Sequence, residues 1–156
     1  MPGKDVSNLI AEWGLWAIKN HKKFHYAQIR PVSYAVTDNM VMDCSTFVSW
    51  CYRQAGAGDP HGPAFHYNGR GYTGTLIANG KRISKVMARP GDIAIYGGGT
   101  GDHAALILAK GFDPVTASMG QEGDPSFCRV SQDGRPARFY RYNTTQKWPS
   151  STPPKP

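Results

Sequence analysis

Apolar residues recur at intervals of three and four positions near the start of the chain, and this pattern predicts an amphipathic first helix. The repeat consists of Val6, Leu9, Ile10, Trp13, Trp16 and Ala17. Asp5 or Ser7 can cap the first turn, because both side chains accept hydrogen bonds from unpaired backbone amides. The helix is expected to end near the basic residues 19–23.

A second helix is predicted within the stretch VMDCSTFVSWCYRQAG, where a short extended apolar segment is followed by a helical pattern. Asp43 is the expected N-cap, and the helix should run to about Ala55. Gly56 can adopt the left-handed conformation that closes a helix. Residues 24–42 mix aromatic residues with Pro31 and other turn formers, so no regular structure is expected there.

The remainder of the chain changes from helical to β-like spacing. Residues 56–76 are rich in Gly, Pro, Asn and His, and this long segment predicts a loop that faces the substrate. Short β-like runs then follow at close spacing: DIAIY, HAALILA, PVTAS, FCRVS and ARFYRY. This order predicts an α+β domain, with N-terminal helices packed on one side of a five- to six-stranded antiparallel sheet.

Length and composition set the domain organisation. A chain of 156 residues with 40% apolar content suits one compact core. We therefore expect a single domain over residues 1–143. Residues 144–156 are rich in Ser, Thr and Pro, which predicts a linker or tail.

The net charge restricts the partners. Lys and Arg outnumber Asp and Glu by 18 to 11, which gives +7 and favours an anionic partner. No basic helix or aromatic RNA-binding pattern accompanies this charge, so nucleic acid is not expected. The N-terminus is too polar for a secretory signal, and no apolar run approaches membrane-spanning length. We expect a monomer, made in the cytoplasm, without a membrane partner.

Three cysteines are too few, and odd in number, for a disulfide framework. Cys44 stands where the second helix begins, and the unpaired amides of a helix N-terminus stabilise a thiolate over a thiol. A lowered pKa and a nucleophilic role are therefore predicted for Cys44. Cys51 and Cys128 are interpreted as core residues, because no such environment is visible around them.

A nucleophilic thiol needs an imidazole to accept its proton, and five histidines are available. His103 opens a predicted strand after a glycine-rich turn, and a rigid strand is a good place for a catalytic base. The other four are interpreted as surface or substrate-contacting residues: His21, His25, His61 and His66. No Cys or His pair has zinc-ligand spacing, and the glycine run lacks the Lys of a phosphate-binding loop. Neither a metal nor another cofactor is expected.

Two of these motifs together carry a family resemblance. DCSTFV, followed by RPGDIAIYGGGTGDHAALIL, resembles the NlpC/P60 superfamily of papain-like cell-wall cysteine peptidases. The segments DPHGPAFHYNGRGYTGTL and GQEGDP further resemble the N-terminal peptidase modules of endolysins from phages of mycobacteria and corynebacteria. The resemblance covers roughly residues 13–141.

The resemblance implies roles for individual residues. Cys44 would be the nucleophile, with its own backbone amide in the oxyanion hole, and His103 would be the general base. Met119 stands where relatives commonly have a His or Glu that orients the imidazole. Strand alternation favours Gln121 for that role, with Glu122 or Ser118 as alternatives.

Substrate contacts follow from the same resemblance. Asp43 and Ser45 flank the nucleophile and are expected to bind the peptide, although both also fit plain helix capping. Relatives often place a Tyr hydroxyl near the thiol. The sequence does not choose between Tyr26 and Tyr34, and Tyr26 is taken as the candidate.

These expectations combine into one functional hypothesis. The chain would be an endolysin domain that cuts an amide bond in peptidoglycan stem peptides after release from the host cytoplasm. The resemblance alone points to the bond between D-glutamate and meso-diaminopimelate. It also implies a C-terminal wall-binding domain in the full-length protein. The alternatives are a CHAP-type amidase that cuts between N-acetylmuramic acid and L-alanine, and a non-catalytic wall-binding module.

Overall fold

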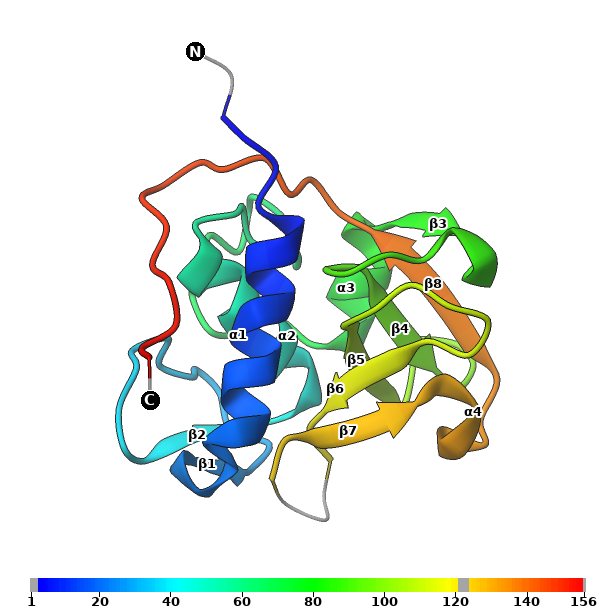
Figure 1. Cartoon of the computed structure of the whole chain (residues 1–156), viewed down its shortest axis with the longest axis horizontal. Helices are drawn as coiled ribbons and strands as arrows, with labels where there is room; N and C mark the ends of the chain where they lie inside the picture. The colour runs from blue at the N-terminus through cyan, green and yellow to red at the C-terminus, as the bar shows by residue number, and fades with distance from the viewer. Residues whose placement is uncertain (1–2, 121–123, 156) are drawn as a thin grey trace.

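The computed structural model describes residues 3–120 and 124–155, and it places the two long helices, α1 (Ser7–Lys19) and α2 (Cys44–Ala55), on one side of the molecule and the main sheet on the other (Figure 1). The other helical segments are η1 (His21–Lys23), α3 (Thr73–Asn79), η2 (Lys85–Met87) and α4 (Val130–Asp133). The strands are β1 (Phe24–Tyr26), β2 (Met40–Met42), β3 (Lys81–Ile83), β4 (Ile93–Tyr96), β5 (His103–Ile107), β6 (Val115–Ser118), β7 (Ser126–Arg129) and β8 (Ala137–Arg141).

The main sheet has six strands in the order β3-β8-β4-β5-β6-β7, and every described pairing within it is antiparallel. The predicted α+β architecture and all five predicted strands are confirmed. The sequence did not predict β3, because two of its three residues are exposed and charged and show no apolar alternation. It also missed β1 and β2, a short parallel pair inside the segment expected to be irregular.

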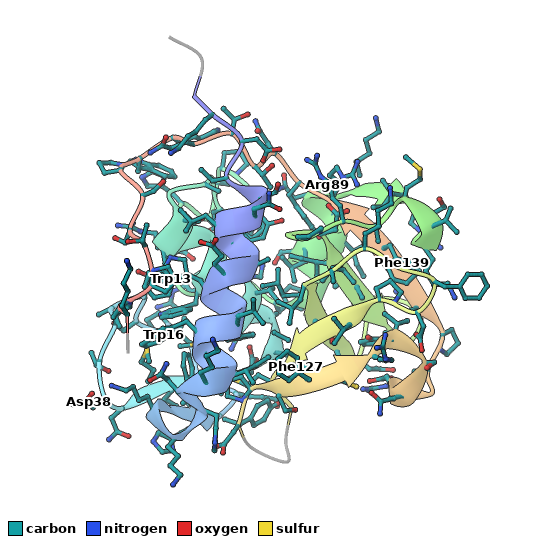
Figure 2. The ribbon with its side chains drawn as sticks, viewed as in Figure 1. Trp13, Trp16, Asp38, Arg89, Phe127 and Phe139 are labelled. Atoms are coloured by element: carbon teal, nitrogen blue, oxygen red, sulfur yellow. The ribbon has the colours of Figure 1, made fainter. Side chains whose placement is uncertain are left out.

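An aromatic cluster joins α1, α2 and β1 in the core, and Figure 2 labels its two members from α1, Trp13 and Trp16. Its ring centroids lie 5.3–6.3 Å apart, mostly in edge-to-face pairs, a geometry that aromatic rings favour. The members are Trp13, Trp16, Phe24, Phe47 and Trp50. The cluster fixes α2 against α1, while the start of α2 reaches β5.

The ends of α2 match the sequence expectation. The Thr46 amide donates to Asp43 Oδ1 over 3.1 Å, and the Thr46 hydroxyl accepts from the Asp43 amide over 2.9 Å, which forms a capping box. Gly56 closes the helix with φ at +85°. The first residue of α2, Cys44, is therefore held in a fixed position.

The Gly- and Pro-rich segment at residues 56–76 is more tightly packed than expected for a substrate-facing loop. Asp59 accepts hydrogen bonds from the amides of His61 and Tyr67 over 2.9 and 2.6 Å. His61 is only 3% exposed, and its Nδ1 lies 2.7 Å from Thr75 Oγ1. The expected surface position of His61 is therefore wrong, because a local carboxylate folds the segment back onto the domain.

Residues 144–151 lie across the helices as an extended strap. The Trp13 indole donates to the Ser151 carbonyl over 2.8 Å, and the Ser151 amide donates to the Gln54 carbonyl over 2.9 Å. The Ser150 hydroxyl donates to the Ala55 carbonyl over 2.6 Å. This part of the tail contacts the domain, whereas the domain boundary after residue 143 and the linker role stay predictions.

Gly14 lets α1 approach the sheet closely. A Cβ added there would lie 2.8 Å from Leu106 Cδ2 and 3.0 Å from Leu108 Cδ2. We expect Gly14→Val to lower the free energy of unfolding by about 1–3 kcal/mol, because overpacking outweighs the small gain in helix propensity. Urea unfolding followed by circular dichroism measures the effect.

The matched control is Gly111→Val, because a Cβ at Gly111 meets nothing within 4 Å. This variant should lie within about 0.5 kcal/mol of the parent. Equal stability of the two variants would contradict close packing of α1 on the sheet.

Candidate active site

Cys44 lies where the N-terminus of α2 meets β5. Its side chain is near the backbone amides of Ala104 and Ser45, which interact with the sulfur. Ala104 directly follows His103 in β5. The fold therefore brings the two residues that the sequence proposed as nucleophile and base to one junction, although 59 positions separate them in the chain.

The electrostatic state of the thiol differs from the expectation. Burial, together with a smaller effect of the adjacent Asp43 carboxylate, raises the pKa of Cys44 to about 11. The amides of Ala104 and Ser45 act in the opposite direction, but they do not outweigh desolvation. The prediction of a lowered pKa is therefore wrong for the substrate-free protein. At neutral pH Cys44 is therefore a thiol, and a nucleophilic role for it would require a base.

His103 is held on two sides. Its Nε2 lies 2.7 Å from the Ser118 hydroxyl, and both side chains are 7% exposed. The Tyr96 ring stacks on the imidazole, with the centroids 5.7 Å apart and the planes 15° from parallel. A hydrogen bond to one ring nitrogen and a flat ring against the face fix the orientation of the imidazole.

Ser118 takes the orienting position through strand register. It pairs with Ala105, which lies two residues from His103 and so points to the same face of the sheet. Met119, the next residue, is fully buried in the core. Gln121, the first choice for the orienting role, and Glu122 lie outside the described residues.

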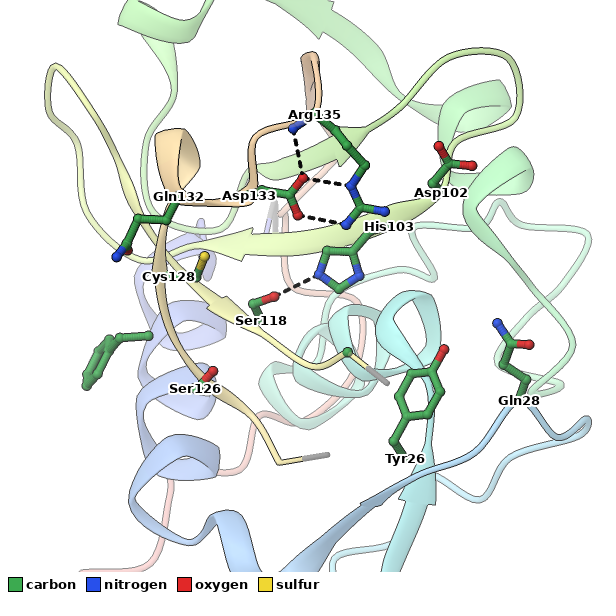
Figure 3. A pocket seen from close by; sticks show the side chains of 12 residues that line it. Tyr26, Gln28, Asp102, His103, Ser118, Ser126, Cys128, Gln132, Asp133 and Arg135 are labelled. Carbon is green, nitrogen blue, oxygen red and sulfur yellow. Dashed lines mark hydrogen bonds and ion pairs between the residues drawn. The ribbon is translucent and has the colours of Figure 1, made fainter. Parts of the chain in front are cut away.

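A cleft of about 450 Å³ opens beside the imidazole (Figure 3). Its described lining comprises Tyr26, Gln28, Asp102, His103, Ser118, Gly120, Ser126, Phe127, Cys128, Gln132, Asp133 and Arg135. Tyr26 thus faces the site, whereas the Tyr34 hydroxyl lies 3.0 Å from Ser49 Oγ. The geometry favours Tyr26 over Tyr34. Cys128 borders the cleft and is half-buried, so the expected core position holds only in part.

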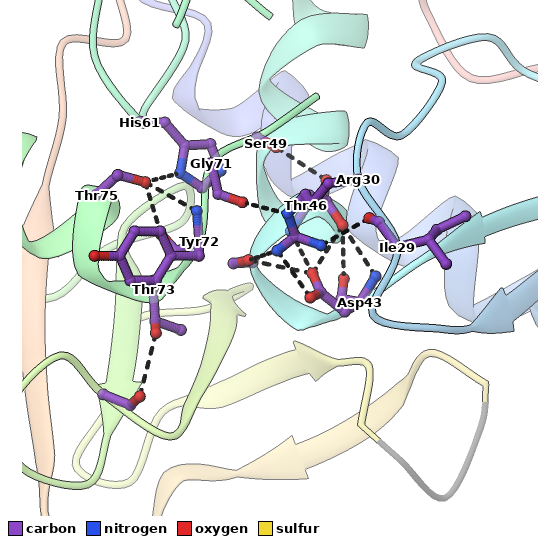
Figure 4. A network of polar contacts seen from close by, with 12 residues as sticks. Ile29, Arg30, Asp43, Thr46, Ser49, His61, Gly71, Tyr72, Thr73 and Thr75 are labelled. Carbon is purple, nitrogen blue, oxygen red and sulfur yellow. Dashed lines mark hydrogen bonds and ion pairs between the residues drawn. The ribbon is translucent and has the colours of Figure 1, made fainter. Parts of the chain in front are cut away.

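Asp43 and Ser45 are buried, the Ser45 hydroxyl donates to Asp43 Oδ1, and Figure 4 shows Asp43 within a network of polar contacts. Arg30 donates to Asp43 Oδ2 over 2.9 Å and lies 3.3 Å from Ser45 Oγ. It also donates to the Gly71 carbonyl over 3.0 Å. The structure gives Asp43 a capping and pairing role, and the predicted substrate contacts of Asp43 and Ser45 stay predictions. No motif or periodicity in the sequence indicated that Arg30 would pair with Asp43.

Among the described residues, no group of three or more His, Cys, Asp or Glu side chains is arranged to hold a metal ion. Within the described parts of the chain, none of the helices combines the length and the apolar character that a membrane crossing requires.

The resting state of Cys44 can be measured by alkylation with iodoacetamide. A thiol pKa of about 11 predicts a rate that rises about tenfold per pH unit from pH 6 to 9 without a plateau, because only the thiolate reacts. Peptide mapping by mass spectrometry separates Cys44 from Cys128, which serves as the internal reference. A plateau below pH 7 at Cys44 would instead show a preformed thiolate.

Comparisons with known proteins identify the family and the fold. The sequence profile described as the NlpC/P60 family matches residues 24–136. The fold is similar to that of the peptidoglycan hydrolase RipB from Mycobacterium tuberculosis, with 20% identity and a TM-score of 0.52, covering 86% of this chain and 65% of RipB. A search of curated proteins found no significant match.

Two further solved structures share the fold. The P60 domain of the antigen MAP1204 from M. avium subspecies paratuberculosis is 20% identical, with a TM-score of 0.51, over 86% of this chain and 96% of that domain. Rv1477, titled a hypothetical invasion protein of M. tuberculosis, is 16% identical, with a TM-score of 0.55, over 94% of this chain and 73% of that structure. The family profile spans well over half of the sequence, and the chain belongs to the NlpC/P60 family of cysteine peptidases.

Proposed function

We propose that this NlpC/P60 domain hydrolyses an amide bond in the stem peptides of peptidoglycan, with Cys44 as nucleophile and His103 as base. One observation carries the assignment: the thiol at the start of α2 contacts the amide of Ala104, the residue next to an imidazole that Ser118 orients. RipB, which shares the fold, is titled a peptidoglycan hydrolase. The surplus of basic residues suits an anionic cell wall.

The mechanism follows from the resting thiol. Cys44 attacks the carbonyl carbon while its proton passes to His103, and backbone amides at the helix start receive the oxyanion. The tetrahedral intermediate collapses to a thioester as the imidazolium gives its proton to the departing amine. Water, deprotonated by the imidazole, then releases the acyl group and restores the thiol. Ser118 accepts from the Nε2 proton while the ring is charged.

The bond cut is proposed to lie between D-glutamate and meso-diaminopimelate, and the biological role is proposed to be that of a phage endolysin domain. Both rest on the sequence resemblance described above. In this proposal the protein is made in the host cytoplasm and reaches the wall after release, with a separate C-terminal domain for wall binding.

The test is digestion of purified peptidoglycan, with products identified by mass spectrometry. We expect the parent protein to split the stem peptide, Cys44→Ala to be inactive, and Cys51→Ala to stay active, because Cys51 is a buried residue remote from the reaction. Release of peptide from muramic acid would show the amidase instead. Unchanged activity in Cys44→Ala, or wall binding without cleavage by the parent, would overturn the proposal.

Ser118→Ala tests the orienting group separately. Loss of one hydrogen bond to a charged imidazole should lower kcat by about tenfold to hundredfold, with little change in KM. The acid limb of the pH profile should move to lower pH, because the imidazolium loses a stabilising hydrogen-bond acceptor and the pKa of His103 therefore falls. An unchanged profile and kcat would show that Ser118 does not act on His103.

A further inference from the structure

The cleft beside His103 receives the leaving-group side of the substrate, if the proposed function holds. His103 and Ser118 line it, whereas Cys44 is not among its described lining residues. In acyl transfer the imidazole protonates the departing amine. The residue that carries this amine, the third residue of the stem peptide, must therefore lie on the imidazole side.

Besides His103, three described residues with charged side chains line this cleft: Asp102, Asp133 and Arg135. Asp133 binds Arg135 through two hydrogen bonds, from Nε to Oδ1 and from Nη2 to Oδ2, each 2.7 Å long. The Asp133 side chain is 9% exposed, whereas that of Arg135 is 43% exposed. Asp133 therefore holds one edge of the guanidinium and contributes little charge of its own to a ligand.

Arg135 is placed close to the catalytic imidazole by packing. Its guanidinium lies over the Tyr96 ring, 5.9 Å from the centroid, and Tyr96 in turn stacks on His103. Figure 3 shows Arg135 between Asp133 and Asp102, above the imidazole. The bidentate pair and the aromatic surface leave the cation ordered before a ligand arrives.

Asp102 supplies the second exposed charge. It directly precedes His103, and its amide donates to the Tyr96 carbonyl over 2.8 Å. The glycine turn before it is held by Arg138, which donates to the carbonyls of Gly97 and Gly99 over 3.0 Å each. The cleft thus presents one carboxylate and one guanidinium on ordered backbone.

We propose that Asp102 and Arg135 form a clamp for a zwitterionic side-chain end, an ammonium and a carboxylate on the same carbon. Asp102 binds the ammonium, and Arg135 binds the carboxylate with the guanidinium N–H groups that Asp133 does not use. Meso-diaminopimelate has this end group. L-lysine, its counterpart in other walls, has the ammonium alone. The clamp would make the third residue of the stem peptide a determinant of specificity.

The test incubates the full chain with three synthetic peptides of sequence L-Ala-γ-D-Glu-X-D-Ala. X is meso-diaminopimelate, its side-chain carboxamide, or L-lysine. The parent protein should cleave the first peptide with kcat/KM about tenfold to hundredfold above the other two, because only this peptide pairs with Arg135. Arg135→Gln should remove that advantage, so that the ratio of kcat/KM between the diaminopimelate peptide and each of the other two falls to about one. Asp102→Asn should lower kcat/KM for all three.

The peptides also separate the two proposals. Cleavage of none of them by the parent protein overturns the proposed bond, and the clamp with it. Cleavage of all three at equal kcat/KM by the parent overturns the clamp alone, and that comparison needs no variant to fold. An equal loss on all peptides in Arg135→Gln, with thermal unfolding unchanged, also overturns it.

Discussion

The contact between the capped N-terminus of α2 and the start of β5 is the interaction on which the proposed chemistry depends. Asp43 fixes the first turn of the helix, and strand pairing fixes His103 and Ala104. The Cys44 sulfur meets the Ala104 amide where these two rigid elements join. The aromatic cluster behind α2 supports the contact, so the core serves the site by holding one helix against one strand.

The surroundings of the thiol set the starting state of the proposed reaction. The pKa of Cys44 is about 11, against an ordinary value of 9.0. Ionisation of this thiol therefore costs about 3 kcal/mol more than ionisation of an ordinary cysteine. The Ser118 hydroxyl lies 2.7 Å from Nε2 of the imidazole. In the proposed mechanism, negative charge develops on the carbonyl oxygen beside the helix amides. Arg30 pairs with Asp43, and this pairing weakens the electrostatic repulsion between the Asp43 carboxylate and the developing oxyanion.

The sequence was informative wherever a local rule determines structure. Asp43, Gly56 and the alternating runs of β4, β5, β6, β7 and β8 follow capping and pairing rules, and Cys44 and His103 were marked by their places at the start of a helix and a strand. Ser118 could not be assigned, because a one-residue change of register moves every side chain to the other face. Arg30 and the strands β1 and β2 depend on tertiary contacts that no periodic pattern records.

The most direct test is capture of the covalent intermediate. An acid-quenched reaction with a γ-D-Glu-meso-diaminopimelate peptide is digested and mapped by mass spectrometry. The account predicts that the peptide containing Cys44 carries the mass of the L-Ala-γ-D-Glu fragment as a thioester that hydroxylamine removes. Turnover of the substrate with no adduct on Cys44, or with the adduct on another residue, would contradict the assignment of Cys44 as the nucleophile.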